Sequence, residues 1–195
     1  MKYRLIYLLS LLFVLSCEDT TPIRDNPLDE EGGDYIAPIV GLLDIVDGDI
    51  LFSEAVEFTW EGNELVTEYR YKYDSFDWTE WSENTSATLD YLDEGDHQLA
   101  VQSRYLSGAT SDVSSLSFVV DAVAGPALMF YPRRHFAEQN ETVTFQILVE
   151  EVTDLMASEI YLEYAPSRLE IISISQGSFF QNGQNSIFLY EINST

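Results

Sequence analysis

The chain has 195 residues, of which 46% are hydrophobic and 13% aromatic, so it has enough apolar side chains to build packed cores. This length allows one or two ordinary domains. The formal net charge of −25 repels phosphate backbones, which argues against nucleic acid as a partner. A single cysteine excludes an internal disulfide, so apolar burial must stabilise the domains.

The first residues have the organisation of a secretory leader. Lys2 and Arg4 form a short positive region, and residues 5–15 are an apolar run broken only by Ser10. The run is shorter than the roughly 20 residues that a comfortable membrane span needs. Loss of these two cations with the leader takes the formal charge from −25 to −27.

The apolar run ends in Val14-Leu15-Ser16-Cys17, and this cysteine is the single one in the chain. The ending resembles the lipobox of bacterial lipoproteins. The resemblance implies diacylglycerol on the Cys17 sulfur, cleavage after Ser16 and acylation of the new amine, which together give stable membrane anchoring. We therefore expect residues 1–17 to be a lipoprotein signal peptide, and the protein to lie at the outer membrane or cell surface. The alternative is an ordinary signal peptide with an incidental cysteine.

Residues 18–37 are expected to form a disordered acidic tether. They contain seven acidic residues, two prolines and the pair Gly32-Gly33, but few apolar residues. Such a composition cannot bury a core and favours an extended chain. The run from Arg24 to Glu31 resembles the segment that follows the cysteine in many surface lipoproteins of Gram-negative bacteria.

Residues 38–121 show a period of two, which predicts β-strands. Turn sequences that contain glycine separate the alternating runs. Short strands at this spacing predict an antiparallel sandwich of about seven strands. The clearest alternating sets are Val56, Phe58 and Trp60, then Tyr69, Tyr71 and Tyr73, then Leu116, Phe118 and Val120.

Trp60 and Tyr69 resemble the core pair of a fibronectin type III or related immunoglobulin-like domain. The run from Tyr69 to Trp81 resembles the triple-tyrosine type of bacterial immunoglobulin-like module, and so does 92–101. His97 stands where this pattern normally has a tyrosine, and we expect one of its ring nitrogens to make the same hydrogen bond to the backbone. The resemblance implies a fold that hosts many functions.

Trp78 and Trp81 allow two interpretations. As ligand-stacking residues they would form a platform for sugar rings. As structural residues they would form a turn that packs over the edge of the sandwich. Alternation would expose one of them at most, which favours packing.

Gly125-Pro126 marks the boundary to a second alternating region, residues 126–195. The order of 141–149, 157–171 and 176–180 resembles the first half of a cohesin domain, the module that receives dockerins in cellulosomes, although Ala165 replaces the family's aspartate. A complete cohesin is longer, so the resemblance implies a partial β-sandwich. It also implies polysaccharide, or another protein module such as a dockerin, as the partner.

Patterns for catalysis and metal binding are absent from the sequence. The two histidines lie in different modules, and no zinc, nucleophile or phosphate-loop pattern occurs. Asp44, Asp47 and Asp49 fit either a calcium loop or a solvated hairpin, and we favour the hairpin. The basic doublet Arg133-Arg134 is expected in a solvated loop. We expect no catalytic residue, no metal site and no cofactor.

These expectations describe an all-β surface lipoprotein with two antiparallel β-sandwiches in tandem, the second incomplete. It would act as a non-enzymatic binding or scaffold protein, held to the membrane by its lipid. The alternative is the accessory N-terminal part of an exported polysaccharide-degrading enzyme. A sensor ectodomain is a third interpretation, which lipid anchoring disfavours.

Overall fold

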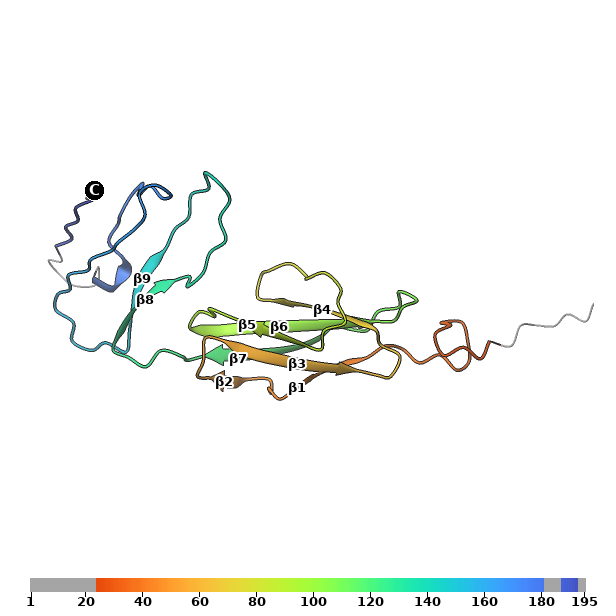
Figure 1. Cartoon of the computed structure of the whole chain (residues 1–195). Coiled ribbons are helices and arrows are strands. Elements are labelled where there is room, and N and C mark those ends of the chain that lie inside the picture. Colours follow the sequence, from red (N-terminus) through yellow and green to blue (C-terminus); the bar gives the residue numbers. More distant parts are fainter. Residues whose placement is uncertain (1–23, 181–186, 193–195) are drawn as a thin grey trace, which may run out of the picture. The chain divides into compact units, whose positions relative to one another are not determined.

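The structure, a computed structural model, describes residues 24–180 and 187–192 (Figure 1). These residues form β-strands and one short 3₁₀ helix but no α-helix, and they contain no helix long and apolar enough to cross a membrane. The elements are β1 (Val40–Leu43), β2 (Asp49–Leu51), β3 (Val56–Gly62), β4 (Glu68–Tyr73), β5 (Ser86–Leu89), β6 (Gly95–Arg104), β7 (Ser114–Val120), β8 (Ala127–Tyr131), β9 (Gln146–Glu150) and η1 (Ser178–Phe180).

Strands β1 to β7 form the two sheets of an all-β sandwich. One sheet has the order β1-β3-β5, and the other has the order β2-β7-β6-β4. The pairs β1–β3 and β4–β6 are antiparallel, whereas β2 pairs with β7 in parallel. This division of strands between two sheets is that of immunoglobulin-like domains, whose architecture fibronectin type III domains share. It confirms the all-β class and the fibronectin-like fold predicted for the first module.

The contacts divide the chain into two compact units. The first comprises residues up to Asp44 together with 59–86 and 99–116, and the second comprises 45–58, 87–98 and 117–195. Strands β3, β5, β6 and β7 therefore have residues in both units. The predicted module boundary at Gly125-Pro126 lies inside the second unit.

In the first unit, alternation along β3 and β4 produces an aromatic core. Trp60 and Tyr69 are 2% and 7% exposed, and their ring centroids lie 6.4 Å apart, so the predicted core pair is confirmed. The Trp60 indole N–H donates to the backbone carbonyl of Asn84 at 3.0 Å, and the Tyr69 hydroxyl accepts the Gly62 N–H at 2.9 Å. Both rings thus bury apolar surface while their polar atoms keep partners.

In the second unit, Phe118 of β7 contacts Phe58 of β3 and stacks on His97 of β6, with ring centroids 5.1 and 5.3 Å apart. The His97 Nε2 atom lies 2.8 Å from the backbone carbonyl oxygen of Asp93. This contact confirms that His97 makes a backbone hydrogen bond at the position where the related modules have a tyrosine.

The described part of the predicted tether forms turns and is not extended. The Asp29 N–H donates to the Asn26 carbonyl at 3.0 Å, and the Ile36 N–H donates to the Pro27 carbonyl at 3.2 Å. The Ile36 carbonyl in turn accepts the hydroxyl of the buried Tyr105 at 2.9 Å. Asparagine, proline and glycine favour such turns. The same residues whose composition predicted disorder therefore also allow residues 24–37 to form turns.

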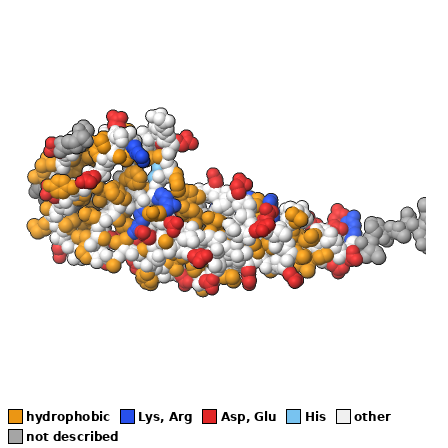
Figure 2. Space-filling model, in the orientation of Figure 1, with side chains coloured by type: hydrophobic (Ala, Val, Ile, Leu, Met, Phe, Trp, Pro, Cys, Tyr) orange, Lys and Arg blue, Asp and Glu red, His pale blue; other side chains and the backbone are white. Residues whose placement is uncertain are grey.

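Within the described residues, the region after 126 contains one two-stranded sheet, β8–β9. Residues 157–171, part of the cohesin-like order, form no strand, and Ile160 and Leu169 are 42% and 58% exposed. Figure 2 shows many hydrophobic side chains at the surface on the side where Figure 1 draws β8 and β9. A two-stranded sheet alone buries little apolar surface. The second sandwich and its cohesin-like topology therefore stay a prediction.

Candidate functional site

The two tryptophans predicted as ligand-stacking residues, Trp78 and Trp81, lie in segment 74–82 after β4, and both are half-buried. The segment folds back along β4. The Ser82 N–H donates to the Tyr69 carbonyl at 2.9 Å, and the Tyr69 N–H donates to the Ser82 carbonyl at 2.7 Å. The backbone of the segment is therefore fixed next to the sheet.

Three cations contact the two indole rings. The guanidinium carbon of Arg70 lies 4.8 Å from the Trp78 ring centroid and 4.5 Å from that of Trp81. The Lys72 Nζ atom lies 5.3 Å from the Trp78 centroid, and the Arg104 Cζ atom lies 4.5 Å from the Trp81 centroid. The quadrupole of an indole ring attracts a cation placed over its face. We name these five residues the cation–indole cluster.

Strand register explains why these cations gather. Arg70 and Lys72 are two residues apart on β4 and therefore project from the same face of the sheet. The Arg70 guanidinium donates twice to the side-chain oxygen of Gln102, its cross-strand neighbour on β6, at 2.7 and 3.1 Å. Arg104 donates to the carboxylate of its own cross-strand neighbour, Glu68, at 2.6 Å. Cross-strand partners thus position two of the three cations.

The cation–indole cluster favours the packing interpretation of the tryptophans. Each indole ring lies within 5.3 Å of two cations that come from the sheet strands β4 and β6. Cation–π contacts contribute about 0.5–2 kcal/mol each, so they hold segment 74–82 on the sheet. The use of Trp78 and Trp81 as ligand-stacking residues stays a prediction.

The three aspartates considered for calcium have separate hydrogen-bond partners. Among the described residues, no group of three or more His, Cys, Asp or Glu is arranged to hold a metal ion. The segment is also not a hairpin, because β1 and β2 on either side of it lie in different sheets and do not pair. Asp44 accepts from the Thr59 hydroxyl at 2.6 Å, Asp47 from the Ser117 N–H at 2.7 Å and Asp49 from the Val46 N–H at 2.8 Å.

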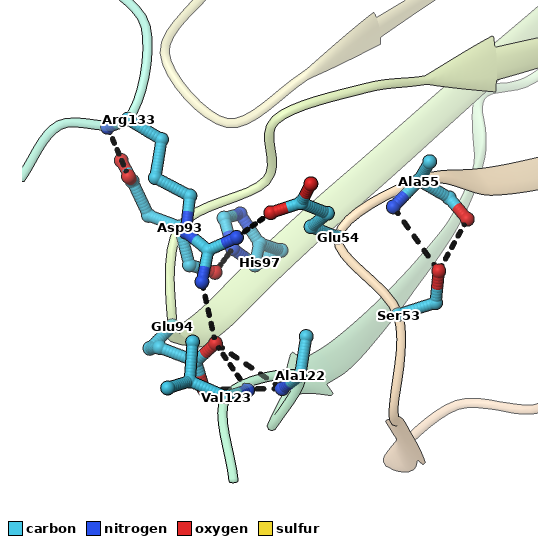
Figure 3. A network of polar contacts seen from close by, with 9 residues as sticks. All are labelled: Ser53, Glu54, Ala55, Asp93, Glu94, His97, Ala122, Val123 and Arg133. Atoms are coloured by element: carbon cyan, nitrogen blue, oxygen red, sulfur yellow. Dashed lines mark hydrogen bonds and ion pairs between the residues drawn. The ribbon is translucent and has the colours of Figure 1, made fainter. Parts of the chain in front are cut away.

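A second polar cluster, which the sequence did not predict, surrounds Arg133 in the second unit (Figure 3). The Arg133 side chain is 12% exposed, so the expectation of a solvated loop is wrong for this residue. Its guanidinium contacts the carboxylates of Glu54 and Glu94, the latter at 3.2 Å. Its backbone N–H donates to the Asp93 carboxylate at 2.7 Å. We name these four residues the Arg133 cluster.

Glu94 also connects the Arg133 cluster to the segment that follows β7 (Figure 3). Its carboxylate accepts the Ala122 N–H at 3.1 and 3.2 Å and the Val123 N–H at 3.1 Å. The Glu94 side chain is 17% exposed, and hydrogen bonds to a partly desolvated carboxylate are strong. The Arg133 Nε atom is buried without a hydrogen-bond partner among the described residues. The hydrogen-bonding groups of Glu94 therefore have more partners within the protein than those of the Arg133 guanidinium.

The neighbouring residue, Arg134, makes a cation–π contact with Tyr91, which lies shortly before Asp93 and Glu94 in the chain. Its guanidinium carbon lies 3.9 Å from the ring centroid of Tyr91 and 5.7 Å from that of Phe136. Tyr91 and Phe136 are 54% and 74% exposed. Arg134 is itself exposed, as the sequence predicted for the doublet.

No protein family and no curated protein matches the sequence. Among solved structures, the fibronectin(III)-like modules of Clostridium thermocellum CbhA match with a TM-score of 0.36 and 14% identity, over 42% of this chain and 95% of that chain. The endo-beta-1,4-mannanase from Thermotoga petrophila matches with a TM-score of 0.35 and 16% identity, over 48% of this chain and 22% of that chain. TM-scores this low carry no conclusion about the present chain.

Proposed function

We propose that this chain is an exported lipoprotein, anchored through Cys17, that acts as a non-catalytic binding or scaffold protein at the cell surface. The observation that carries the proposal is the position of the single cysteine at the end of an apolar leader. Cys17 lies outside the described residues, so the anchor rests on the sequence.

In this proposal, the sandwich is a spacer and the residues after 126 bind the partner. A buried aromatic core and paired strands suit a rigid spacer, and the cation–indole and Arg133 clusters bond to the protein's own groups. Apolar side chains remain exposed after residue 126, for example Leu162 at 50% and Ile172 at 71%. The partner class is polysaccharide or another protein module such as a dockerin, as the cohesin resemblance implies.

The anchor is tested by metabolic labelling with palmitate in cells that make the natural chain, Cys17→Ser or the control Ser16→Gly. The control keeps a small residue before the cysteine, so it should retain both label and membrane association. Cys17→Ser should lose the label and leave the membrane fraction. A Cys17→Ser protein that stays labelled and membrane-bound would contradict the proposal.

The binding role is tested with purified residues 18–195. We expect weak retention on an insoluble polysaccharide, or capture of a dockerin-type module, without release of soluble sugar. Release of reducing sugar would support the alternative of an enzyme. Failure to retain any polysaccharide or dockerin-type module would contradict the proposed partner class but not the anchor.

A further inference from the structure

The segments before and after β8 both bond to the same loop of the sandwich, residues 91–94, within the second unit. Before β8, the Ala122 and Val123 N–H groups donate to the Glu94 carboxylate. After β8, the Arg133 N–H and guanidinium bond to Asp93 and Glu94, and Arg134 covers the Tyr91 ring. Figure 3 shows the polar contacts converging on Asp93 and Glu94 from two segments of the chain.

Gly125, in the connection before β8, packs closely against the backbone and side chain at the end of β9. The Gly125 N–H donates to the Glu151 carboxylate at 3.0 Å, next to the end of β9. A Cβ atom at Gly125 would lie 2.3 Å from the Glu151 Cβ and 2.8 Å from the Glu150 carbonyl oxygen. The backbone at this position therefore has no room for a side chain.

We propose that these contacts form a rigid joint, in which residues 122–134 are fixed to the 91–94 loop and Glu54. The connection at Gly125-Pro126 is then not a flexible linker, and β8–β9 moves together with the rest of the second unit. The contacts differ in kind: a charged pair of low exposure, hydrogen bonds from backbone to carboxylate, a cation–π contact and a close backbone approach. Because they act at residues 122, 123, 125, 133 and 134, they restrict the segment together more than any one of them does alone.

The joint follows from the Arg133 cluster and Gly125, not from the lipid anchor or the partner. It adds a rigid connection at residues 122–134 to the proposed spacer, which neither the leader nor the fold alone requires. Its test therefore stands apart from the tests of the proposed function.

The test is ¹⁵N relaxation and amide hydrogen exchange on the mature chain carrying Cys17→Ser, which removes the proposed lipid. The heteronuclear NOE of residues 122–125 should equal that of β7, and the Ala122 and Val123 amides should be protected. Arg133→Met keeps the apolar stem without the charge. It should lower these NOE values and reduce protection by about tenfold while β7 stays unchanged.

Arg168→Met is the matched control, because Arg168 is exposed and lies outside the cluster. It should change neither quantity. Glu94→Gln weakens the bonds to Ala122, Val123 and Arg133, so it should reproduce the effect of Arg133→Met. If Arg133→Met fails to fold, the Glu94→Gln measurement tests the joint in its place. NOE values typical of a freely moving linker at 122–125 in the parent chain would overturn the joint, as would unchanged protection in both cluster variants.

Discussion

The sandwich and the region after Gly125 have similar alternating sequences, yet they bury very different amounts of apolar surface. Phe58 and Leu99 of the sandwich are 1% and 0% exposed, whereas Leu128 and Leu162 of the later region are 54% and 50% exposed. The sandwich strands lie in sheets of three and four strands, and β8 pairs with β9 alone in the described part of the chain. Alternation thus determines which face of a strand is apolar, but burial requires a second sheet to cover that face.

The sharpest test of this difference is truncation of one large side chain in each region. Trp60→Ala should reduce the free energy of unfolding by about 3–5 kcal/mol, because it leaves a cavity in a closed core. Ile160→Ala should cost under about 0.5 kcal/mol, because that side chain is already half exposed. Denaturant unfolding followed by near-UV circular dichroism measures both. Equal losses would show that the later region has a core of its own.

A second test addresses the Arg133 cluster, in which Arg133 of the later region bonds to Glu54, Asp93 and Glu94. Arg133→Met should reduce the free energy of unfolding by about 2 kcal/mol, because it removes the cation beside Glu94. The effect stays below that of a fully buried pair, since Glu54 is 51% exposed and Glu94 keeps its backbone donors. Denaturant unfolding again gives the value, with Arg168→Met as the near-neutral control. A loss as small as that of the control would place Arg133 in solvent.

A smaller effect is expected in the cation–indole cluster. Arg70→Met should cost about 1 kcal/mol, because it removes the cation over both indole rings but keeps the side-chain stem. A double-mutant cycle with Trp81→Leu isolates the interaction, which should be favourable. A coupling energy of zero between Arg70 and Trp81 would contradict the proposal that the cation holds the indole ring on the sheet. Loss of polysaccharide retention in Trp81→Leu, with stability unchanged, would instead support the ligand-stacking interpretation.

The smallest expected effect concerns Glu141 in the later region. The backbone N–H of Glu138 and then the His135 ring lower the pKa of the Glu141 carboxyl below its ordinary value. A carboxyl whose pKa is lowered by folding stabilises its turn above the unfolded pKa, and this contribution is lost as pH falls through the folded pKa. NMR titration of the Glu141 side chain should show this depressed pKa. An ordinary pKa would indicate that the 138–141 turn is not formed in solution.

The sequence predicted the sandwich because its information is local. Period-two alternation marked the strands, and the core pair of Trp60 and Tyr69 followed from the resemblance to fibronectin-like modules. The resemblance, which places His97 where related modules have a tyrosine, also led us to expect its backbone hydrogen bond, and the partner Asp93 lies four residues away. Such short-range relations are visible in one sequence without knowledge of the pairing of distant strands.

The Arg133 cluster could not be predicted in the same way. Arg133 is separated from Glu54 by 79 residues and from Glu94 by 39, so no periodicity connects them. A doublet of arginines ordinarily indicates a solvated loop, and Arg134 is exposed as expected. The cation–indole cluster could be predicted from the sequence only in part. Arg70 and Lys72 alternate visibly on one strand, but Arg104 reaches Trp81 only through the register of β4 and β6.

Whether Cys17 carries a lipid is decided by mass spectrometry of the N-terminal peptide isolated from the native membrane. We expect a chain that begins at Cys17 and carries the added mass of a diacylglycerol thioether and an acylated amine. A peptide that retains Met1 to Ser16, or one that begins at Cys17 without added mass, would contradict it.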